Sequence, residues 1–280
     1  MRKMAEQLNV DEIQNIANKM RLDVIEMTTA AGSGHPGGSL SAADAVAALY
    51  FRIMNIDPAD PYKDDRDRFV LSKGHAAPIL YAALAERGYF PTDELKTLRK
   101  IGSRLQGHPA YHDVPGVEVT TGSLGQGLSM ACGIALAGKM DGKSYRTYCL
   151  LGDGELQEGQ NWEAAMFAHA YGLSNLTALV DRNRLQISGN TEEVMGLDPL
   201  PEKFKAFGWN VEIIDGHNIR MIIDACGKAA RSKKNPTVII LNTVKGKGVS
   251  FMENNVGFHG KACNPEEYAK AVAELKAVIR

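Results

Sequence analysis

Net charge, cysteines and long apolar runs are all scarce in this sequence, and each scarcity excludes a class of protein. The 280 residues carry 32 basic and 33 acidic side chains, and the net charge of −1 gives no indication of a nucleic-acid partner or an acidic membrane surface. No apolar segment approaches the roughly 18 residues that cross a bilayer, and the polar N-terminus has no signal-peptide core. We therefore expect neither membrane nor nucleic acid among its partners.

The four cysteines are spread along the chain without a CxxC pair or any metal-ligand spacing. Cys132 and Cys149 fall within apolar helix and strand patterns, where a thiol is usually buried. This usage is typical of a reduced protein, and we expect a cytoplasmic location.

What the sequence does contain is a regular alternation of helical and extended hydrophobic patterns. Apolar steps of three and four predict helices over residues 11–31, 41–53, 76–87, 125–138, 159–172, 219–231 and 265–279. Short apolar runs predict strands over residues 69–71, 145–151, 176–180, 211–214 and 237–241. Residues 101–123 and 243–263 are expected to be irregular. The alternation favours an α/β fold with a mostly parallel sheet, covered by helices on both faces, in a single domain over residues 1–280.

The most informative motif is Gly152-Asp153-Gly154, which is followed by Asn183 after the next expected helix and strand. Asp153 and Asn183 thus fall at the carboxyl ends of two successive strands, an edge where open parallel sheets bind ligands. Carboxylate and amide oxygens suit Mg²⁺ or Ca²⁺, and Mg²⁺ usually completes its shell with phosphate and water. A lone Gly-Asp-Gly is more often a helix-capping corner, so the neighbouring motifs decide between the two interpretations.

Four of the seven histidines lie beside glycine or proline in predicted loops. They are His35, His75, His108 and His259. Imidazole donates to anions and titrates near neutrality, so four such loops together predict a polar pocket with proton carriers and phosphate donors. Taken singly, each of these histidines would be a surface or core-edge residue. The other three, His112, His169 and His217, lack this context and receive no role.

Two glycine patterns do not match known phosphate loops. Gly32, Gly34 and Gly37 have the spacing of a dinucleotide fingerprint, but they follow a helix instead of a strand. Residues 245–248 lack the leading glycine of a phosphate loop. Residues 120–127 instead precede a helix, whose free N–H groups can face a ligand.

Taken in order, six motifs resemble those of transketolases. They are residues 33–38, 72–76, 107–109 and 121–127, then Gly152-Asp153-Gly154 with Asn183, and finally His259-Gly260. The resemblance implies a thiamine diphosphate-binding fold. It also implies transfer of a two-carbon ketol unit from a ketose phosphate to an aldose phosphate, in the pentose phosphate pathway. The implied cofactors are thiamine diphosphate and Mg²⁺, which Ca²⁺ or Mn²⁺ can replace.

The resemblance further implies roles for individual residues. Asp153, the Asn183 side chain and the Leu185 carbonyl would bind the metal. His75, the Gly154 backbone and His259 resemble contacts to the diphosphate. The residues facing the reacting sugar carbons would be His35, His108 and His259, which would move protons and steady negative charge.

The remaining cofactor-site positions implied by the resemblance are Gly122, Ser123, Leu124, Gly152 and Glu158. Gly122 and Leu124 resemble backbone contacts to the aminopyrimidine ring, while Ser123 stands where many full-length members carry proline. Glu158 resembles a buried carboxylate at the subunit interface that communicates with the opposite site.

The chain departs from full-length transketolases by stopping after the first of their three domains. It lacks the family's carboxylate that activates the aminopyrimidine and the arginines that grip the sugar phosphate. This departure implies the N-terminal subunit of a split transketolase, working with a separate C-terminal subunit in an α₂β₂ assembly on sugar phosphates.

Three alternatives stay open at this point. The chain could belong to a related ketol or acyl transferase, such as a dihydroxyacetone synthase or a deoxyxylulose-phosphate synthase. It could be a non-catalytic scaffold that keeps the fold, although the intact set of candidate residues argues against this. It could also be a fragment of a longer enzyme, whereas Met1 and the helical pattern up to Ile279 favour a natural end.

Overall fold

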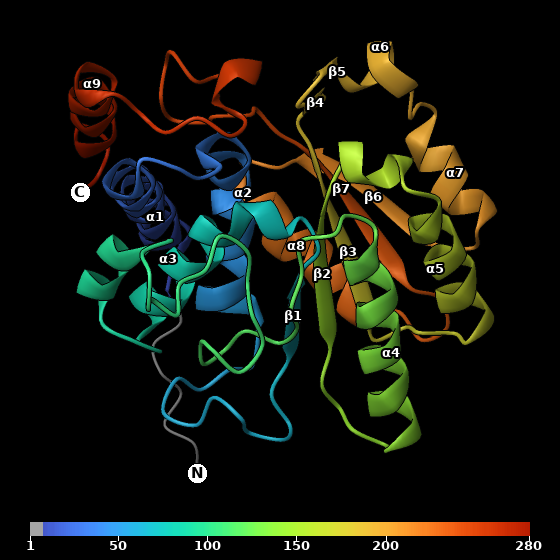
Figure 1. The fold of residues 1–280 in the computed structure, drawn as a ribbon. Coiled ribbons are helices and arrows are strands. Elements are labelled where there is room, and N and C mark those ends of the chain that lie inside the picture. Colours follow the sequence, from blue (N-terminus) through green and yellow to red (C-terminus); the bar gives the residue numbers. More distant parts are fainter. Residues whose placement is uncertain (1–7) are drawn as a thin grey trace.

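Five parallel strands form the centre of the molecule in the computed structural model, which describes residues 8–280 (Figure 1). They are β1 (Arg68–Leu71), β2 (Thr147–Gly152), β3 (Leu176–Arg182), β6 (Asn210–Asp215) and β7 (Thr237–Asn242). Their order across the sheet is β1-β2-β3-β7-β6, and every neighbouring pair is parallel. The predicted α/β fold with a parallel sheet is therefore confirmed. The first seven residues of the predicted domain lie outside the described residues.

Alternate residues of the central strands face two different hydrophobic cores. Tyr148 and Leu150 of β2 belong to the first core, and Cys149 and Leu151 to the second. The helices over the first core are α1 (Val10–Ala31), α2 (Pro36–Ala48), α3 (Ala77–Arg87), α8 (Ile219–Ala230) and α9 (Pro265–Lys276). Those over the second core are α4 (Gln126–Met140), α5 (Gly159–Ala170) and α7 (Leu200–Ala206). Helices thus cover both faces of the sheet, as the sequence predicted (Figure 1).

Short elements complete the described chain. β4 (Leu185–Gln186) and β5 (Gly189–Asn190) form an antiparallel pair that leads into α6 (Thr191–Met195). Short 3₁₀ helices occur at Gly74–Ala76, Thr92–Thr97, Gly154–Gln157 and Val256–Phe258. None of the helices in residues 8–280 combines the length and apolarity that a membrane crossing requires.

The second helix differs from its prediction at both ends. We expected residues 41–53, but α2 begins at Pro36 and its α-helical part ends at Ala48. Proline suits the first turn of a helix because it has no N–H to leave unpaired. The two glycines that follow Pro36 disfavour a helix, yet every residue of α2 is buried, so packing overrides local propensity. Residues 49–53 continue as a π-helical turn, and the last helix ends at Lys276, three residues earlier than predicted.

The parallel order brings four loops to one edge of the sheet. β1 ends at Leu71, β2 at Gly152, β3 at Arg182 and β7 at Asn242. The strand register places Gly152 beside Asp181, and Arg182 beside Asn242. Residues that directly follow these strands are therefore neighbours in space, although they are far apart in the sequence.

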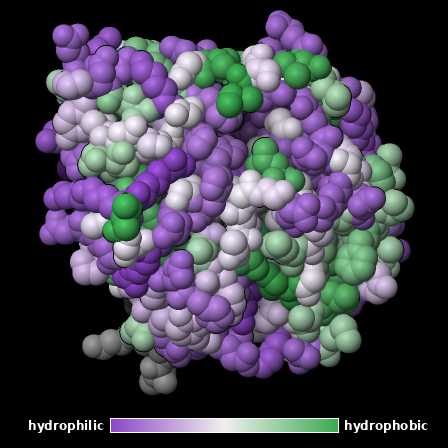
Figure 2. Space-filling view, in the orientation of Figure 1, coloured by the Kyte–Doolittle hydropathy of each residue, from purple (hydrophilic) through white to green (hydrophobic). Residues whose placement is uncertain are grey.

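Two neighbouring helices on the second core expose large hydrophobic side chains. Met130 and Met140 of α4, Met166 of α5 and Tyr171 just after α5 are all exposed to solvent. In Figure 2, hydrophobic residues gather over the region of α4 and α5, whereas hydrophilic residues cover most of the rest of that face. An apolar surface of this kind is typical of a contact with another protein chain.

A pair of carboxylic acids lies between α1 and α3. One carboxyl oxygen of Asp23 and one of Glu86 are buried without any hydrogen-bond partner. Lys19 pairs with the other Glu86 oxygen at 2.8 Å. Burial, and then the Glu86 charge, raises the pKa of Asp23 to about 7. Because the folded state holds this proton more tightly than the unfolded chain, the free energy of unfolding falls as pH rises from about 4 to about 7.

We expect the Asp23→Asn substitution to remove this pH dependence. Relative to the wild type, the variant should gain about 1–3 kcal/mol of unfolding free energy between pH 4 and pH 8, because its amide carries no charge to bury. Urea denaturation across this range measures the difference. The exposed Asp224 serves as the matched control, and Asp224→Asn should follow the wild type. Parallel pH profiles for wild type and Asp23→Asn would contradict the assignment.

Candidate active site

A cavity of about 370 Å³ opens at the carboxyl edge of the sheet. Most of the residues singled out in the sequence line it, namely His35, His75, Gly122, Leu124, Gly152, Asp153, Gly154, Glu158, Asn183, Leu185 and His259. Another hollow, of about 420 Å³, lies near the start of β1 and β2 and contains none of them. The candidate residues thus share one site, which lies where the topology of a parallel sheet places ligands.

Two predicted residues are not part of the cavity lining. Ser123 is exposed, while its neighbours Gly122 and Leu124 face the cavity. His108 is also exposed, and its ring lies against Gly122, so that a β-carbon added to this glycine would be 3.2 Å from the imidazole. His108 therefore stands next to the lining at Gly122. Partial removal of the ring from water, and then the nearby Arg99 charge, lowers the pKa of His108 although the residue as a whole is exposed.

Glu158 is exposed in this chain, in contrast to the buried interface carboxylate that it resembles. Its side chain lines the cavity and packs against Gly125, whose backbone has a φ of +87°. A β-carbon on Gly125 would lie 2.7 Å from the Glu158 side chain. Glycine at this position therefore provides both the backbone angle and the space for Glu158.

The three predicted metal ligands lie together on neighbouring loops. Asp153 is buried, and its carboxylate accepts hydrogen bonds from the backbone N–H groups of Gly154 and Arg184. The Asn183 amide donates to Asp181 at 3.2 Å, and its Oδ1 accepts from the Leu185 N–H at 3.1 Å. The Leu185 carbonyl accepts from the Lys245 ammonium at 3.0 Å.

This donor set fits a hard divalent cation. Within residues 8–280, Asp153 forms no ion pair, and burial followed by the Asp181 charge raises its pKa to about 6. The nearby Lys245 charge offsets only part of this effect, and a cation bound at a buried carboxylate without an ion pair would be stabilising. The described residues contain no group of three or more His, Cys, Asp or Glu side chains able to hold a metal. One carboxylate, one amide and one carbonyl instead match a site whose remaining ligands are phosphate and water.

Three histidines that line the cavity form a triangle. The ring centroids are 5.4 Å apart for His35 and His75, 5.3 Å for His75 and His259, and 5.7 Å for His35 and His259. Burial is the main cause that lowers the pKa of His35 to about 4 and of His259 to about 3, with positive neighbours adding to it. The Nδ1 atoms of His35 and His259 are buried without a partner. These neutral rings can therefore donate to, or accept from, a bound ligand.

The structure adds two lysines that sequence reasoning did not select. Lys73 and Lys245 both line the cavity and are almost fully buried. Lys73 forms an ion pair with Asp181, whereas burial, and then the Lys73 charge, lowers the pKa of Lys245 to about 8. Lys73 lies within the loop quoted for His75, and Lys245 lies in the glycine-rich segment that was rejected as a phosphate loop. Each lysine precedes a glycine shortly after the end of a strand, and this position is the feature by which the sequence could have identified both as site residues.

Glu155 is the buried carboxylate of the Gly-Asp-Gly corner. It accepts hydrogen bonds from the Ser72 hydroxyl and from the backbone N–H groups of Gly125 and Gly152, the last two at 3.0 Å. These contacts join the loop after β1, the start of α4 and the end of β2. The sequence analysis named Glu158, on the resemblance to transketolases, and did not select Glu155.

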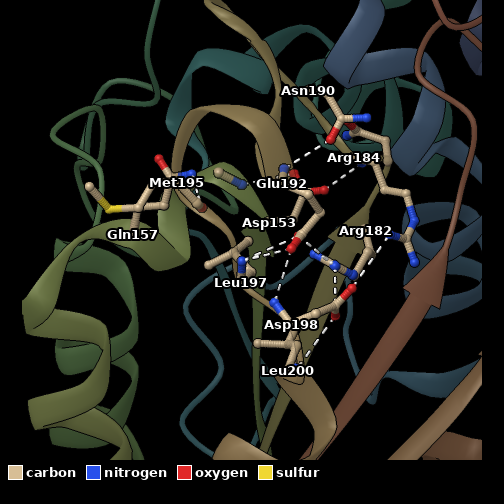
Figure 3. A network of polar contacts seen from close by, with 12 residues as sticks. Asp153, Gln157, Arg182, Arg184, Asn190, Glu192, Met195, Leu197, Asp198 and Leu200 are labelled. Atoms are coloured by element: carbon tan, nitrogen blue, oxygen red, sulfur yellow. Dashed lines mark hydrogen bonds and ion pairs between the residues drawn. The ribbon is translucent and has the colours of Figure 1, made fainter.

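A polar network holds the segment from β4 to α7 beside the cavity (Figure 3). The buried Arg182 guanidinium pairs with Glu192 and Asp198, both at 2.9 Å. Gln157 donates to the Gln186 side chain at 2.7 Å and to the Met195 carbonyl at 2.9 Å. These bonds fix the loop that carries Leu185 against the corner that carries Asp153.

The carboxyl edge of the parallel sheet thus gathers a buried carboxylate, buried lysines and clustered histidines, and this chemistry would suit a phosphate ligand together with a divalent cation. The family model for the transketolase thiamine diphosphate-binding domain matches residues 12–277. The chain therefore belongs to the transketolase family. It is 49% identical over 265 residues to the 6-deoxy-6-sulfo-D-fructose transketolase subunit SqwG of a Clostridium species, covering 95% of this chain and 96% of that protein.

Other relatives include both short and long proteins. Identity is 45% to an apulose-4-phosphate transketolase subunit of Phocaeicola vulgatus, with 98% of this chain and 96% of that protein covered. Identity is 47% to the transketolase of Pongo abelii, with 98% of this chain but only 44% of that protein covered. The solved transketolase of Campylobacter jejuni superimposes with a TM-score of 0.90 at 33% identity, over 96% of this chain and 43% of that one. The chain thus spans less than half of the full-length enzymes.

We expect the Glu155→Gln substitution to destabilise the fold. Both carboxylate oxygens of Glu155 accept hydrogen bonds, but the glutamine amide nitrogen can only donate. The amide nitrogen would therefore face an N–H or O–H donor, which should lower the free energy of unfolding by about 1–3 kcal/mol. Urea denaturation measures this loss. The exposed Glu163 of α5 provides a control of the same chemistry, and Glu163→Gln should stay within about 0.5 kcal/mol of wild type. Equal stability of the two variants would show that Glu155 does not join the three loops.

Proposed function

We propose that this chain, as a single thiamine diphosphate-binding domain, is the N-terminal subunit of a split transketolase. With a separate C-terminal subunit it transfers a two-carbon ketol unit from a ketose phosphate to an aldose phosphate. The observation that carries this proposal is the single cavity shared by Asp153, Asn183, Leu185 and the three clustered histidines. The two subunit-sized relatives, which this chain covers almost completely, support the split organisation.

The chain's own residues would hold the metal and the cofactor diphosphate. The Asp153 carboxylate, the Asn183 Oδ1 and the Leu185 carbonyl would bind Mg²⁺, with Ca²⁺ or Mn²⁺ as substitutes. A cation at the Leu185 carbonyl replaces the Lys245 ammonium there, which leaves this lysine free to contact a phosphate oxygen. His75, His259 and the Gly152 and Gly154 backbone would complete the phosphate contacts, and Gly122 to Leu124 would contact the aminopyrimidine ring.

When bound, thiamine diphosphate supplies the carbanion chemistry that amino-acid side chains lack. The histidines of this chain would manage protons on the sugar oxygens. His35 and His259 suit this role because their low pKa values keep them neutral, with a buried Nδ1 atom in each ring still unpartnered. His108, which stands beside Gly122, would face the same substrate from the rim.

The partner subunit would supply what this chain lacks, namely the activating carboxylate and most of the recognition of the sugar phosphate. Exposed Glu158 and the exposed apolar side chains of α4 and α5 support burial against other chains, in an α₂β₂ assembly. The pair would act in the cytoplasm, in the pentose phosphate pathway.

The names of the two subunit-sized relatives specify different sugars, so the donor is best determined directly. Ketose phosphates and 6-deoxy-6-sulfofructose, offered one at a time with a common aldose phosphate acceptor, would rank the donors by kcat/KM. A preference for a pentulose phosphate supports the pentose phosphate assignment. A preference for the sulfonate sugar would move the same ketol transfer to another pathway.

We expect Asp153→Ala to abolish metal-dependent cofactor binding. The variant removes the only charged ligand of the proposed metal site, so thiamine diphosphate affinity should fall by at least about 100-fold and lose its dependence on Mg²⁺. Isothermal titration calorimetry with and without Mg²⁺ measures both effects. Asp224→Ala, an exposed substitution on α8, is the matched control. Wild-type affinity in the Asp153 variant would overturn the metal assignment.

We expect His108→Ala to separate binding from turnover. Since His108 does not line the cavity, cofactor affinity should stay close to wild type, while kcat of the assembled enzyme should fall on the order of 100-fold or more. Steady-state ketol transfer at saturating thiamine diphosphate measures kcat. As a control, His112→Ala changes a neighbouring histidine to which no role is assigned and should leave kcat unchanged. Unchanged turnover in the His108 variant would remove this residue from the mechanism.

A further inference from the structure

His217, one of the histidines without an assigned role, joins the active-site loop to a buried ion pair. It lies between β6 and α8 and does not line the cavity. Its Nδ1 is 2.7 Å from the Asp44 carboxylate, and its Nε2 accepts the backbone N–H of Val244 at 2.9 Å. Because Nε2 accepts, the proton of the neutral ring must be on Nδ1, which donates to Asp44. Both ring nitrogens of His217 are therefore engaged in hydrogen bonds.

The carboxylate behind His217 is itself held firmly. Asp44 is almost fully buried and pairs with the buried Arg21 guanidinium, and it also accepts from Gln14 at 2.8 Å. Burial alone would raise the pKa of Asp44, but the Arg21 charge and the hydrogen bonds from His217 and Arg21 lower it to about 2. Asp44 is thus a permanent acceptor, which fixes the orientation of the His217 ring.

The backbone that His217 holds leads directly to Lys245. Three successive contacts position this segment at the end of β7. The Thr243 hydroxyl donates to Asp181, the Val244 N–H donates to His217, and the Gly246 N–H donates to the Gly37 carbonyl at 3.0 Å. The contact from Val244 holds the residue directly before Lys245. Lys245 lies between the second and the third contact, its carbonyl accepts the Asn254 N–H at 2.9 Å, and its ammonium is 3.0 Å from the Leu185 carbonyl.

We propose that His217 is a positioning residue that holds Val244 so that the Lys245 ammonium faces the bound diphosphate. This inference rests on the proposed function. Arg21, Asp44 and His217 form a chain of contacts that runs from α1, through α2, to the loop after β7. A shift of Val244 would move the Lys245 backbone with it, and a buried charge that is misplaced contributes little to phosphate binding.

Two substitutions of His217 separate its two contacts. In His217→Asn, the amide reaches the position of Nδ1 and can still donate to Asp44, but nothing replaces Nε2 as the acceptor for Val244. In His217→Gln, the longer amide places an oxygen near the position of Nε2, while the contact with Asp44 is lost. Asp44 keeps Arg21 and Gln14 as partners in both variants, so neither leaves a buried charge unpaired.

The affinity of the assembled enzyme for thiamine diphosphate, titrated at fixed Mg²⁺ by calorimetry, tests the proposal. We expect His217→Asn to weaken binding about tenfold, the effect of one lost hydrogen bond of about 1.4 kcal/mol, and His217→Gln to stay within about threefold of wild type. In a Lys245→Met background, His217→Asn should have no further effect on affinity. Thermal melts confirm that each variant is folded. If His217→Asn does not fold, His217→Gln still tests the proposal, because binding weaker than wild type by much more than about threefold in this variant would contradict it.

Three results would overturn the proposal. They are wild-type affinity in His217→Asn, weaker binding in His217→Gln than in His217→Asn, or an undiminished effect of His217→Asn when Lys245 is already Met. Failure of the proposed function looks different, because the wild-type assembly itself would then show no Mg²⁺-dependent binding of thiamine diphosphate. The two failures are therefore distinguishable in one set of titrations.

Discussion

The buried ion pair between Lys73 and Asp181 is the contact on which the site depends. Both side chains are almost completely removed from water, which costs several kcal/mol per charge unless hydrogen bonds offset it. Asp181 also accepts from Ser41, Thr243 and Asn183, and these donors come from α2, the end of β7 and the loop after β3. One carboxylate thus joins four elements and turns the Asn183 amide so that its nitrogen faces Asp181 while its oxygen accepts the Leu185 N–H.

The charges around the cavity would suit a diphosphate bound together with a divalent metal, as we propose. Asp153 has no cationic partner within the described residues, whereas Lys245 is buried beside another lysine. Each is destabilised by burial when the cavity is considered alone. A divalent metal stabilises the carboxylate, a polyanion stabilises the ammonium, and a metal diphosphate provides both at once. The histidines, neutral in the absence of such a ligand, add donors without adding further repulsion.

Much of this site could be predicted from the sequence, because strand ends in a parallel sheet converge on one edge. Asp153 and Asn183 were recognisable as a pair for this reason. Glu155 and Lys245 were not, because their importance lies in contacts with loops distant in the sequence. The start of α2 was predicted five residues too late, because burial of the whole helix overrides the glycines after Pro36. His217 had no local signature at all, since both of its partners come from other elements.

The most direct test of this account is ketol transfer by the reconstituted pair. The chain, a candidate C-terminal partner and their mixture would each be assayed with xylulose 5-phosphate, ribose 5-phosphate, thiamine diphosphate and Mg²⁺. The account predicts activity only in the mixture, because it assigns the cofactor clamp and the activating carboxylate to different chains. Activity of this chain alone would contradict it and would mean that these 280 residues contain a substitute for the missing carboxylate.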